Sequence, residues 1–151
     1  MINFRKATKK DVPEIVKMLA DDELGKIRED YKIPLPDVYY QAFENINQDS
    51  NQELMVVETG EKEIIGTLQL TFIQDLSHQG GLRAQIEAVR INKNQRGKGI
   101  GKKMFEWAIQ QAKNRGAYLM QLTTNRQRPE AIEFYKSLNF NPSHVGMKMY
   151  F

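Results

Sequence analysis

The sequence contains no cysteine, and this absence removes several kinds of chemistry at once. Disulfides, thiolate metal sites, iron–sulfur clusters and cysteine nucleophiles are all excluded. There are only two histidines, His78 and His144, and they stand 66 positions apart, so a histidine-rich metal site is excluded as well. We therefore expect a protein that works without a bound metal.

Long apolar runs are also missing. Leu54–Val57 is among the longest, whereas a membrane-spanning helix needs about 20 consecutive apolar residues. The N-terminal residues include no apolar stretch of the kind found in secretion signals. The chain has 151 residues, of which 40% are hydrophobic and 27% charged, values typical of a globular domain. We expect one domain over residues 1–151, a cytoplasmic location and no association with membranes.

Acidic residues are absent from residues 88–105, a stretch that carries six Lys and Arg side chains. The net charge of the chain is +3, so the other 133 residues sum to −3. A protein that binds nucleic acid over its whole surface spreads its basic residues more widely. Aromatic residues that stack on single-stranded nucleic acid are not interleaved with these basic ones either. The pattern favours a compact anionic ligand at one loop and no nucleic-acid partner.

Hydrophobic periodicity predicts a mixed α/β chain. The expected strands are residues 2–7, 53–58, 64–73, 82–91, 119–124 and 145–151, and the expected helices are residues 12–20, 38–46, 100–115 and 129–138. Residues 25–36 are expected to form a polar connection. Strict alternation in the fourth strand would place Glu87, Val89 and Ile91 on one face. Alternation at the end of the chain predicts that the C-terminus lies within the sheet.

A glycine-rich loop, residues 95–101, joins a predicted strand to a strongly amphipathic predicted helix. Glycines let the backbone approach a ligand, and the free N–H groups of a first helical turn bind phosphate. The loop is not a Walker A motif, because Lys102 is followed by Lys103 instead of Ser or Thr. It is not a Rossmann fingerprint either, because Met104 and Gln121 stand where a glycine and an acid are needed. The alternative to a phosphate-binding loop is a tight surface turn whose lysines are solvated.

The motif Arg96-x-x-Gly99-x-Gly101 matches the acetyl-CoA pyrophosphate-binding signature Q/R-x-x-G-x-G/A. With its flanking residues, the chain resembles the GNAT superfamily of N-acetyltransferases. Residues 86–91 resemble the family's fourth strand, and residues 125–140 are similar to its C-terminal region. Residues 123–144 are also similar to the aminoalkylphosphonate N-acetyltransferase branch.

The resemblance implies a single-domain α/β (α+β) fold. Its mixed, mostly antiparallel central sheet would have a V-shaped splay and be flanked by about four helices. The implied activity is that of an acyltransferase, which moves acetyl from acetyl-CoA to a primary amine by direct attack. The absence of cysteine agrees with a reaction that needs no covalent enzyme intermediate. A small-molecule acceptor is expected, although the sequence does not name it. Acetylation of a protein or peptide amine and a CoA-binding regulatory module without turnover remain as alternatives.

The resemblance also implies roles for individual residues. Tyr135 matches the position of the family's general acid, although periodicity alone would make it a core tyrosine. We take Glu87 as the candidate general base, with a histidine or a chain of water molecules as the alternatives. A homodimer is considered, through Trp107 or the last strand. The residues expected to bind acetyl-CoA are Val89, Arg90, Ile91, Arg96, Gly97, Lys98, Gly99, Ile100, Gly101, Lys102 and Asn125.

Overall fold

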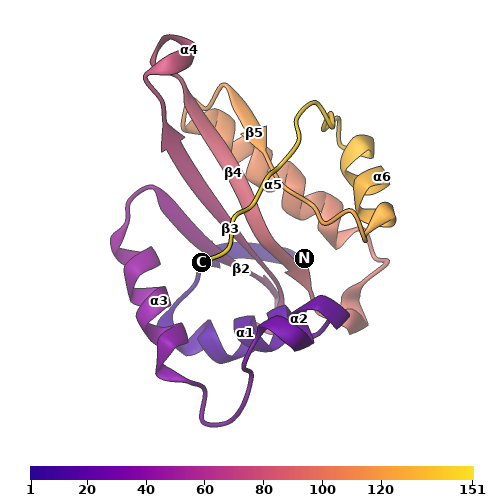
Figure 1. The fold of residues 1–151 in the computed structure, drawn as a ribbon. Helices are drawn as coiled ribbons and strands as arrows, with labels where there is room; N and C mark the ends of the chain where they lie inside the picture. The colour runs from indigo at the N-terminus through magenta and orange to yellow at the C-terminus, as the bar shows by residue number, and fades with distance from the viewer.

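The structure, a computed structural model, describes residues 1–151. Its five strands form one sheet in the order β1-β2-β3-β4-β5 (Figure 1). The strands are β1 (Ile2–Lys6), β2 (Gln52–Thr59), β3 (Ile64–Gln74), β4 (Leu82–Ile91) and β5 (Leu119–Gln121). The helices are α1 (Val12–Ala20), α2 (Glu23–Arg28), α3 (Asp37–Gln48), α4 (Ser77–Gly80), α5 (Ile100–Asn114) and α6 (Pro129–Ser137), with short 3-10 turns at Lys9–Asp11 and Lys93–Gln95. None of the helices is both long and apolar enough to cross a membrane.

The predicted fold class is confirmed, including the splay of the sheet. The pairs β1–β2, β2–β3 and β3–β4 are antiparallel, and only β4–β5 is parallel. That parallel pairing covers three residues and ends at Gln85 and Gln121. From Ile86 to Ile91, β4 therefore runs on without a neighbouring strand on this side. The sheet opens there into a V.

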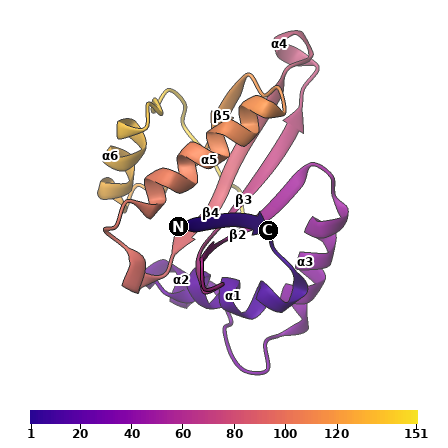
Figure 2. The same cartoon turned by 180° about the vertical axis from the view of Figure 1, so that it is seen from behind.

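The two faces of the sheet are covered by different helices (Figures 1 and 2). On one face, Met104, Phe105 and Ala108 of α5 are fully buried in the larger core cluster. On the other face, Ile15 of α1 and Phe43 of α3 belong to a smaller cluster. Because apolar residues recur along α5 at helical spacing, the sequence predicted this packing face correctly.

The predicted strand over residues 145–151 is wrong. The chain after α6 forms no strand, and its last eleven residues are exposed. Alternating apolar residues favour a strand only when a neighbouring strand pairs with their backbone groups. No backbone group of residues 144–151 is hydrogen-bonded to the rest of the chain. The predicted polar connection after α1 also differs, because Asp22 caps the short helix α2 by accepting a hydrogen bond from the Gly25 N–H.

A β-bulge interrupts β4. Two of its residues, Ala88 and Val89, stand opposite the single residue Leu68 of β3. Ala88 has a positive φ of 52°, which is unusual for a residue with a side chain. A bulge of this kind changes which face the following side chains occupy.

The bulge contradicts the predicted common face of Glu87, Val89 and Ile91. Val89 and Ile91 pack against the core cluster under α5. Glu87 pairs with an odd-numbered residue of β3, as Arg90 does, so these two side chains lie on the opposite face. Strict alternation could not reveal this, because the inserted residue shifts the pattern by one position.

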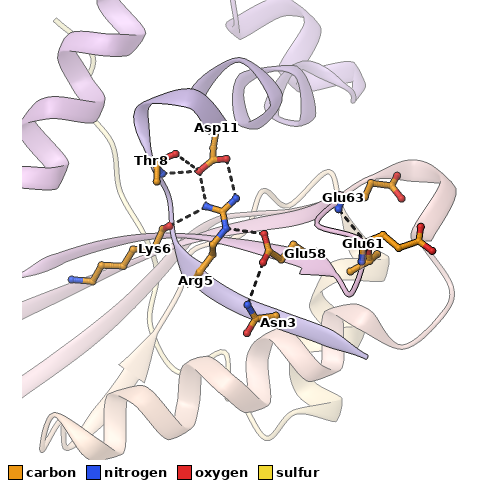
Figure 3. Close-up of polar contacts among 9 residues, drawn as sticks. Asn3, Arg5, Lys6, Thr8, Asp11, Glu58, Glu61 and Glu63 are labelled. Atoms are coloured by element: carbon orange, nitrogen blue, oxygen red, sulfur yellow. Dashed lines mark hydrogen bonds and ion pairs between the residues drawn. The ribbon is translucent and has the colours of Figure 1, made fainter.

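An ion-pair network fastens the start of α1 to the edge strand β1 (Figure 3). The Arg5 guanidinium donates to both carboxylate oxygens of Asp11, at 2.7 and 3.0 Å, and to Glu58 at 2.7 Å. Asp11 also accepts hydrogen bonds from the backbone and hydroxyl of Thr8. Burial acts to raise the pKa of Asp11, but these hydrogen bonds outweigh it and lower the pKa below its ordinary value. The pKa of Glu58 is lowered by hydrogen bonds from Arg5 and then Asn3.

We expect Asp11→Ala to lower the free energy of unfolding by about 2 kcal/mol, because Arg5 and Thr8 lose a shared acceptor. Since the folded pKa of Asp11 is depressed, its contribution is present above the unfolded pKa of about 3.9 and is lost as the pH falls further. Urea denaturation at pH 7 and pH 3 should therefore show a difference from wild type that shrinks in acid. Glu61→Ala, an exposed carboxylate in the same region, is the control and should change little. Equal stability of Asp11→Ala and wild type at pH 7 would contradict this role.

Candidate functional site

A cleft of about 940 Å³ opens where β4 and β5 separate. Its walls are the end of β4, the glycine-rich loop, the first turns of α5, the start of α2, and α6 with the two residues before it. Nine of the eleven residues predicted to bind acetyl-CoA line it: Val89, Arg90, Ile91, Arg96, Gly97, Gly99, Ile100, Gly101 and Lys102. The other two do not. Lys98 is exposed and donates to Gln95, while Asn125 is exposed and accepts a hydrogen bond from the Gln127 N–H.

The glycine-rich loop shapes one end of the cleft. Gly97 and Gly99 have φ of 76° and 74°, a conformation that side chains rarely adopt. Gly99 is the N-cap of α5, and the first backbone hydrogen bond of the helix runs from Lys103 to Gly99. The N–H groups of residues 100–102 are therefore free, at the positive end of a 15-residue helix. This arrangement suits a phosphate group.

Backbone groups of β4 line the next part of the cleft. Beyond Gln85, this edge of β4 has no neighbouring strand, so its outward N–H and C=O groups are available to a ligand. Val89 and Ile91 lie within this stretch. An extended amide-containing chain, such as pantetheine, can pair with such an edge as a strand would.

Tyr135 of α6 lies on the cleft wall beside a cluster of aromatic rings. Its ring lies 5.5 Å from that of Phe105 and 5.7 Å from that of Phe134. Burial raises the pKa of Tyr135, and the positive charges of Arg90 and Arg128 offset only part of that effect. The phenol therefore keeps its proton at neutral pH and can donate it.

Two arginines and one aspartate form a charged patch on the cleft wall near Tyr135. Arg128 Nη2 lies 2.7 Å from Asp22 Oδ2, and Arg90 Nη2 lies 3.6 Å from the same oxygen. Burial lowers the pKa of Arg90, and the charge of Asp22 counteracts it in part. Arg90 Nε is buried without a hydrogen-bond partner. The patch itself carries two positive charges and one negative charge, and the carboxylates of Glu23 and Glu130 also line the cleft.

The sequence did not identify this charged patch as a unit. Asp22 and Arg128 are 106 positions apart, and only the tertiary fold brings them together. Two weak signals were available in the sequence: an Arg-Pro pair at the start of a predicted helix, and an excess of acidic residues over residues 11–30.

The candidate bases lie outside the cleft lining. Glu87 is exposed on the strand face that also carries Arg90. His78 stacks on Tyr118 at 5.3 Å, in α4 at the far tip of the β3–β4 hairpin (Figure 1). His144 is exposed in the C-terminal segment. Of these three groups, Glu87 is nearest in the chain to a residue of the cleft wall.

Comparison with known proteins identifies the family. A model of the acetyltransferase (GNAT) family matches residues 19–140. The chain belongs to the GNAT family. The resemblance noted from residues 86–101 and 125–140 is thereby confirmed. A member of the GNAT family is expected to be an acetyl-CoA-dependent acyltransferase.

Individual relatives of this GNAT protein carry different descriptions. The crystal structure of a transcriptional regulator from Bacillus halodurans C-125 superposes on this chain with a TM-score of 0.95. The two sequences are 50% identical, and the match covers 100% of both chains. The aminoalkylphosphonate N-acetyltransferase of Salmonella typhimurium is 30% identical over 82 residues, which cover 54% of this chain and about half (53%) of that enzyme. A predicted acetyltransferase from Clostridium acetobutylicum, solved with acetyl-CoA, has the same fold, with a TM-score of 0.74, 22% identity and coverage of 99% and 96% of the two chains.

Proposed function

We propose that this GNAT protein transfers the acetyl group of acetyl-CoA to the primary amine of a small molecule that also carries an anionic group. The observation that carries the proposal is the cleft itself. Free N–H groups at the start of α5, an unpaired edge of β4 and a protonated tyrosine line one continuous space. The residues fit acetyl-CoA, whose pyrophosphate, pantetheine and thioester need these three features in that order.

The reaction that this arrangement supports is a direct transfer. The CoA pyrophosphate binds the N–H groups of residues 100–102 together with Arg96 and Lys102. The free amine attacks the thioester carbonyl carbon, and backbone N–H groups of residues 89–91 stabilise the oxyanion that develops. The carbon–sulfur bond then breaks, and the thiolate takes the proton of the Tyr135 hydroxyl. We propose that Glu87 accepts the proton lost by the amine through an intervening water molecule.

We expect Tyr135→Phe to lower kcat about 10-fold with little change in the affinity for acetyl-CoA. Loss of an interaction made only in the transition state has this signature. Burial raises the pKa of Tyr135, so wild-type activity should not fall through loss of this proton until the pH exceeds the ordinary tyrosine value of about 10. Steady-state kinetics and CoA titration measure both effects. A variant with full kcat would make Tyr135 a packing residue.

The charged patch supports an acceptor with an anionic group. The guanidinium groups of Arg90 and Arg128 have more donors than Asp22 can accept. A carboxylate or phosphonate would satisfy them with charge-assisted hydrogen bonds. The similar Salmonella enzyme is described as acting on aminoalkylphosphonates, which carry an amine and an anionic group together.

We expect Arg128→Ala to raise the KM for an aminoalkylphosphonate by about 10- to 100-fold, the loss expected for one charge-assisted hydrogen bond. The KM for an uncharged amine should change much less, because no anion is bound. Arg126→Ala removes an exposed arginine two positions away and is the matched control. Equal effects on charged and uncharged acceptors would contradict recognition of an anion.

The proposed function is tested by the release of free CoA thiol. The purified chain is incubated with acetyl-CoA and with aminophosphonates, amino acids, polyamines, aminoglycosides or peptide N-termini. Acceptor-dependent thiol release that is largest with an acidic amine supports the proposal. Turnover only with peptide amines would favour the protein-acetylation alternative.

A second function is favoured by one observation. The Bacillus halodurans relative, identical at half of its positions over the whole chain, is described as a transcriptional regulator. A CoA-binding regulatory protein would keep the phosphate-binding loop without turnover. Thermal stabilisation by CoA combined with no thiol release for any acceptor would support that function and contradict ours.

A further inference from the structure

Asp22, at the corner between α1 and α2, has a carboxylate whose two oxygens bind different partners. Its Oδ1 accepts a hydrogen bond from the Gly25 N–H and caps α2. Its Oδ2 accepts a hydrogen bond from Arg128 Nη2 at 2.7 Å and lies 3.6 Å from Arg90 Nη2. Because the cap uses only Oδ1, the contact with the arginines can be broken while α2 stays capped.

The Asp22 carboxylate is ionised at neutral pH and reachable from the cleft. Burial acts to raise its pKa, but hydrogen bonds from the Gly25 N–H and Arg128, with the charge of Arg90, outweigh it and lower the pKa below its ordinary value. The side chain is 22% exposed. Of the three acidic residues that line the cleft, Asp22 is the one paired with these arginines. An ionised carboxylate therefore stands where the two arginines would meet an anion from the cleft.

Asp22 is an incomplete partner for the two arginines. Arg90 Nη1 donates to the Val89 carbonyl at 2.9 Å, whereas Nη2 comes no closer than 3.6 Å to Asp22, which is too long for a hydrogen bond. A phosphonate or phosphate group carries three oxygens on one atom and can accept hydrogen bonds from both arginines at once. Such an anion gains more from this patch than Asp22 does, and it can replace the carboxylate.

We propose that Asp22 occupies the anion subsite of the free protein and that the anionic group of the acceptor displaces its carboxylate from Arg128. The inference rests on the proposed function, because it takes the charged patch as the subsite for the acceptor's anionic group. Asp22 is then a specificity-determining residue, since every anion that binds must first break the contact between Asp22 and Arg128. Only an anion that satisfies both arginines better than Asp22 binds tightly, which selects a group with several oxygens on one atom.

Binding of methylphosphonate to the CoA-saturated protein, measured by isothermal titration calorimetry, tests the displacement. CoA fills the phosphate-binding loop, so methylphosphonate reports on the charged patch and no acetyl transfer is needed. Asp22→Asn removes the charge and keeps the cap, because asparagine caps helices as well as aspartate does. We expect this variant to bind methylphosphonate about 10-fold more tightly than wild type, the gain when one charge-assisted hydrogen bond no longer has to be broken.

The stability of the free protein separates this role from a merely structural one. Without CoA or methylphosphonate, Asp22→Asn should melt at a lower temperature than wild type, because Arg128 loses its acceptor. A residue that only holds the arginines in place would lower both the stability and the affinity for the anion. Displacement predicts opposite changes, with lower stability and tighter binding.

Three further variants control the measurement. Asp21→Asn removes the same charge one position earlier, beside Arg96 at 3.7 Å, and should leave the Kd for methylphosphonate close to that of wild type. Asp22→Ser also caps α2 without a carboxylate and should reproduce the tighter binding of Asp22→Asn. In an Arg128→Ala background, Asp22→Asn should strengthen binding much less, because the contact to be broken is already gone.

The outcomes separate this inference from the proposed function. Equal or weaker binding of methylphosphonate by both Asp22→Asn and Asp22→Ser would overturn the displacement and leave the anion subsite in place. No binding by wild type or by either variant would overturn the displacement and the anion subsite together. Tighter binding by Asp22→Asn supports the displacement even where no acceptor releases CoA thiol, a result that would refute acetyl transfer alone.

Discussion

A Gly101→Leu variant is expected to bind CoA at least 100-fold more weakly than wild type while keeping its fold. A Cβ at this position would lie 3.3 Å from Ile91 Cδ1 and 3.5 Å from Phe134 Cζ. A longer side chain must therefore project between the end of β4 and α6, into the space that the pantetheine needs. The neighbouring atoms are the ends of side chains, which can move, so the apo fold should survive.

Thermal unfolding with and without CoA measures this effect. For wild type, CoA at a hundredfold excess over Kd should add about 2.7 kcal/mol to the free energy of unfolding, and for Gly101→Leu it should add almost nothing. Gly60→Leu is the matched control, because a Cβ on Gly60 meets nothing within 4 Å and Gly60 lies in the β2–β3 turn. If Gly101→Leu is stabilised by CoA as much as wild type, CoA does not occupy the space between the end of β4 and α6.

Glu87→Gln should lower kcat/KM about 100-fold at neutral pH, the low end of what a general base contributes. Glutamine keeps the size of the side chain but cannot accept the proton of the ammonium. The defect should shrink as the pH rises, because a larger fraction of the amine is then already neutral. Glu63→Gln, an exposed residue before β3, is the control.

The shape of the pH profile decides whether Glu87 is the base. Glu87 lies on the strand face of Arg90 but outside the cleft lining, so its proton transfer requires a water molecule. An unchanged acidic limb in Glu87→Gln would exclude it and leave His144, His78 or a chain of water molecules. The β-bulge at Ala88 places Glu87 on the opposite strand face from Val89 and Ile91, the apolar neighbours that strict alternation predicted for it.

The sequence by itself determined the elements that carry the site. β4 runs from Leu82 to Ile91 as predicted, and α5 begins at Ile100, within the last residues of the glycine-rich loop. Both are local features: periodicity fixes which face of α5 is apolar, and Gly99 supplies the left-handed conformation at its N-cap. The motif that begins at Arg96, together with its flanking residues, was therefore enough to indicate the family.

Only the tertiary structure decided the rest, because those features depend on residues far apart in the chain. The ion pair of Asp22 with Arg128 joins the start of α2 to the start of α6. The face of Glu87 depends on how β4 pairs with β3, where a single inserted residue reverses the alternation. The conformation of residues 144–151 depends on whether a neighbouring strand is present. Their alternating apolar residues are typical of a strand, but a strand forms only where another strand pairs with its backbone groups.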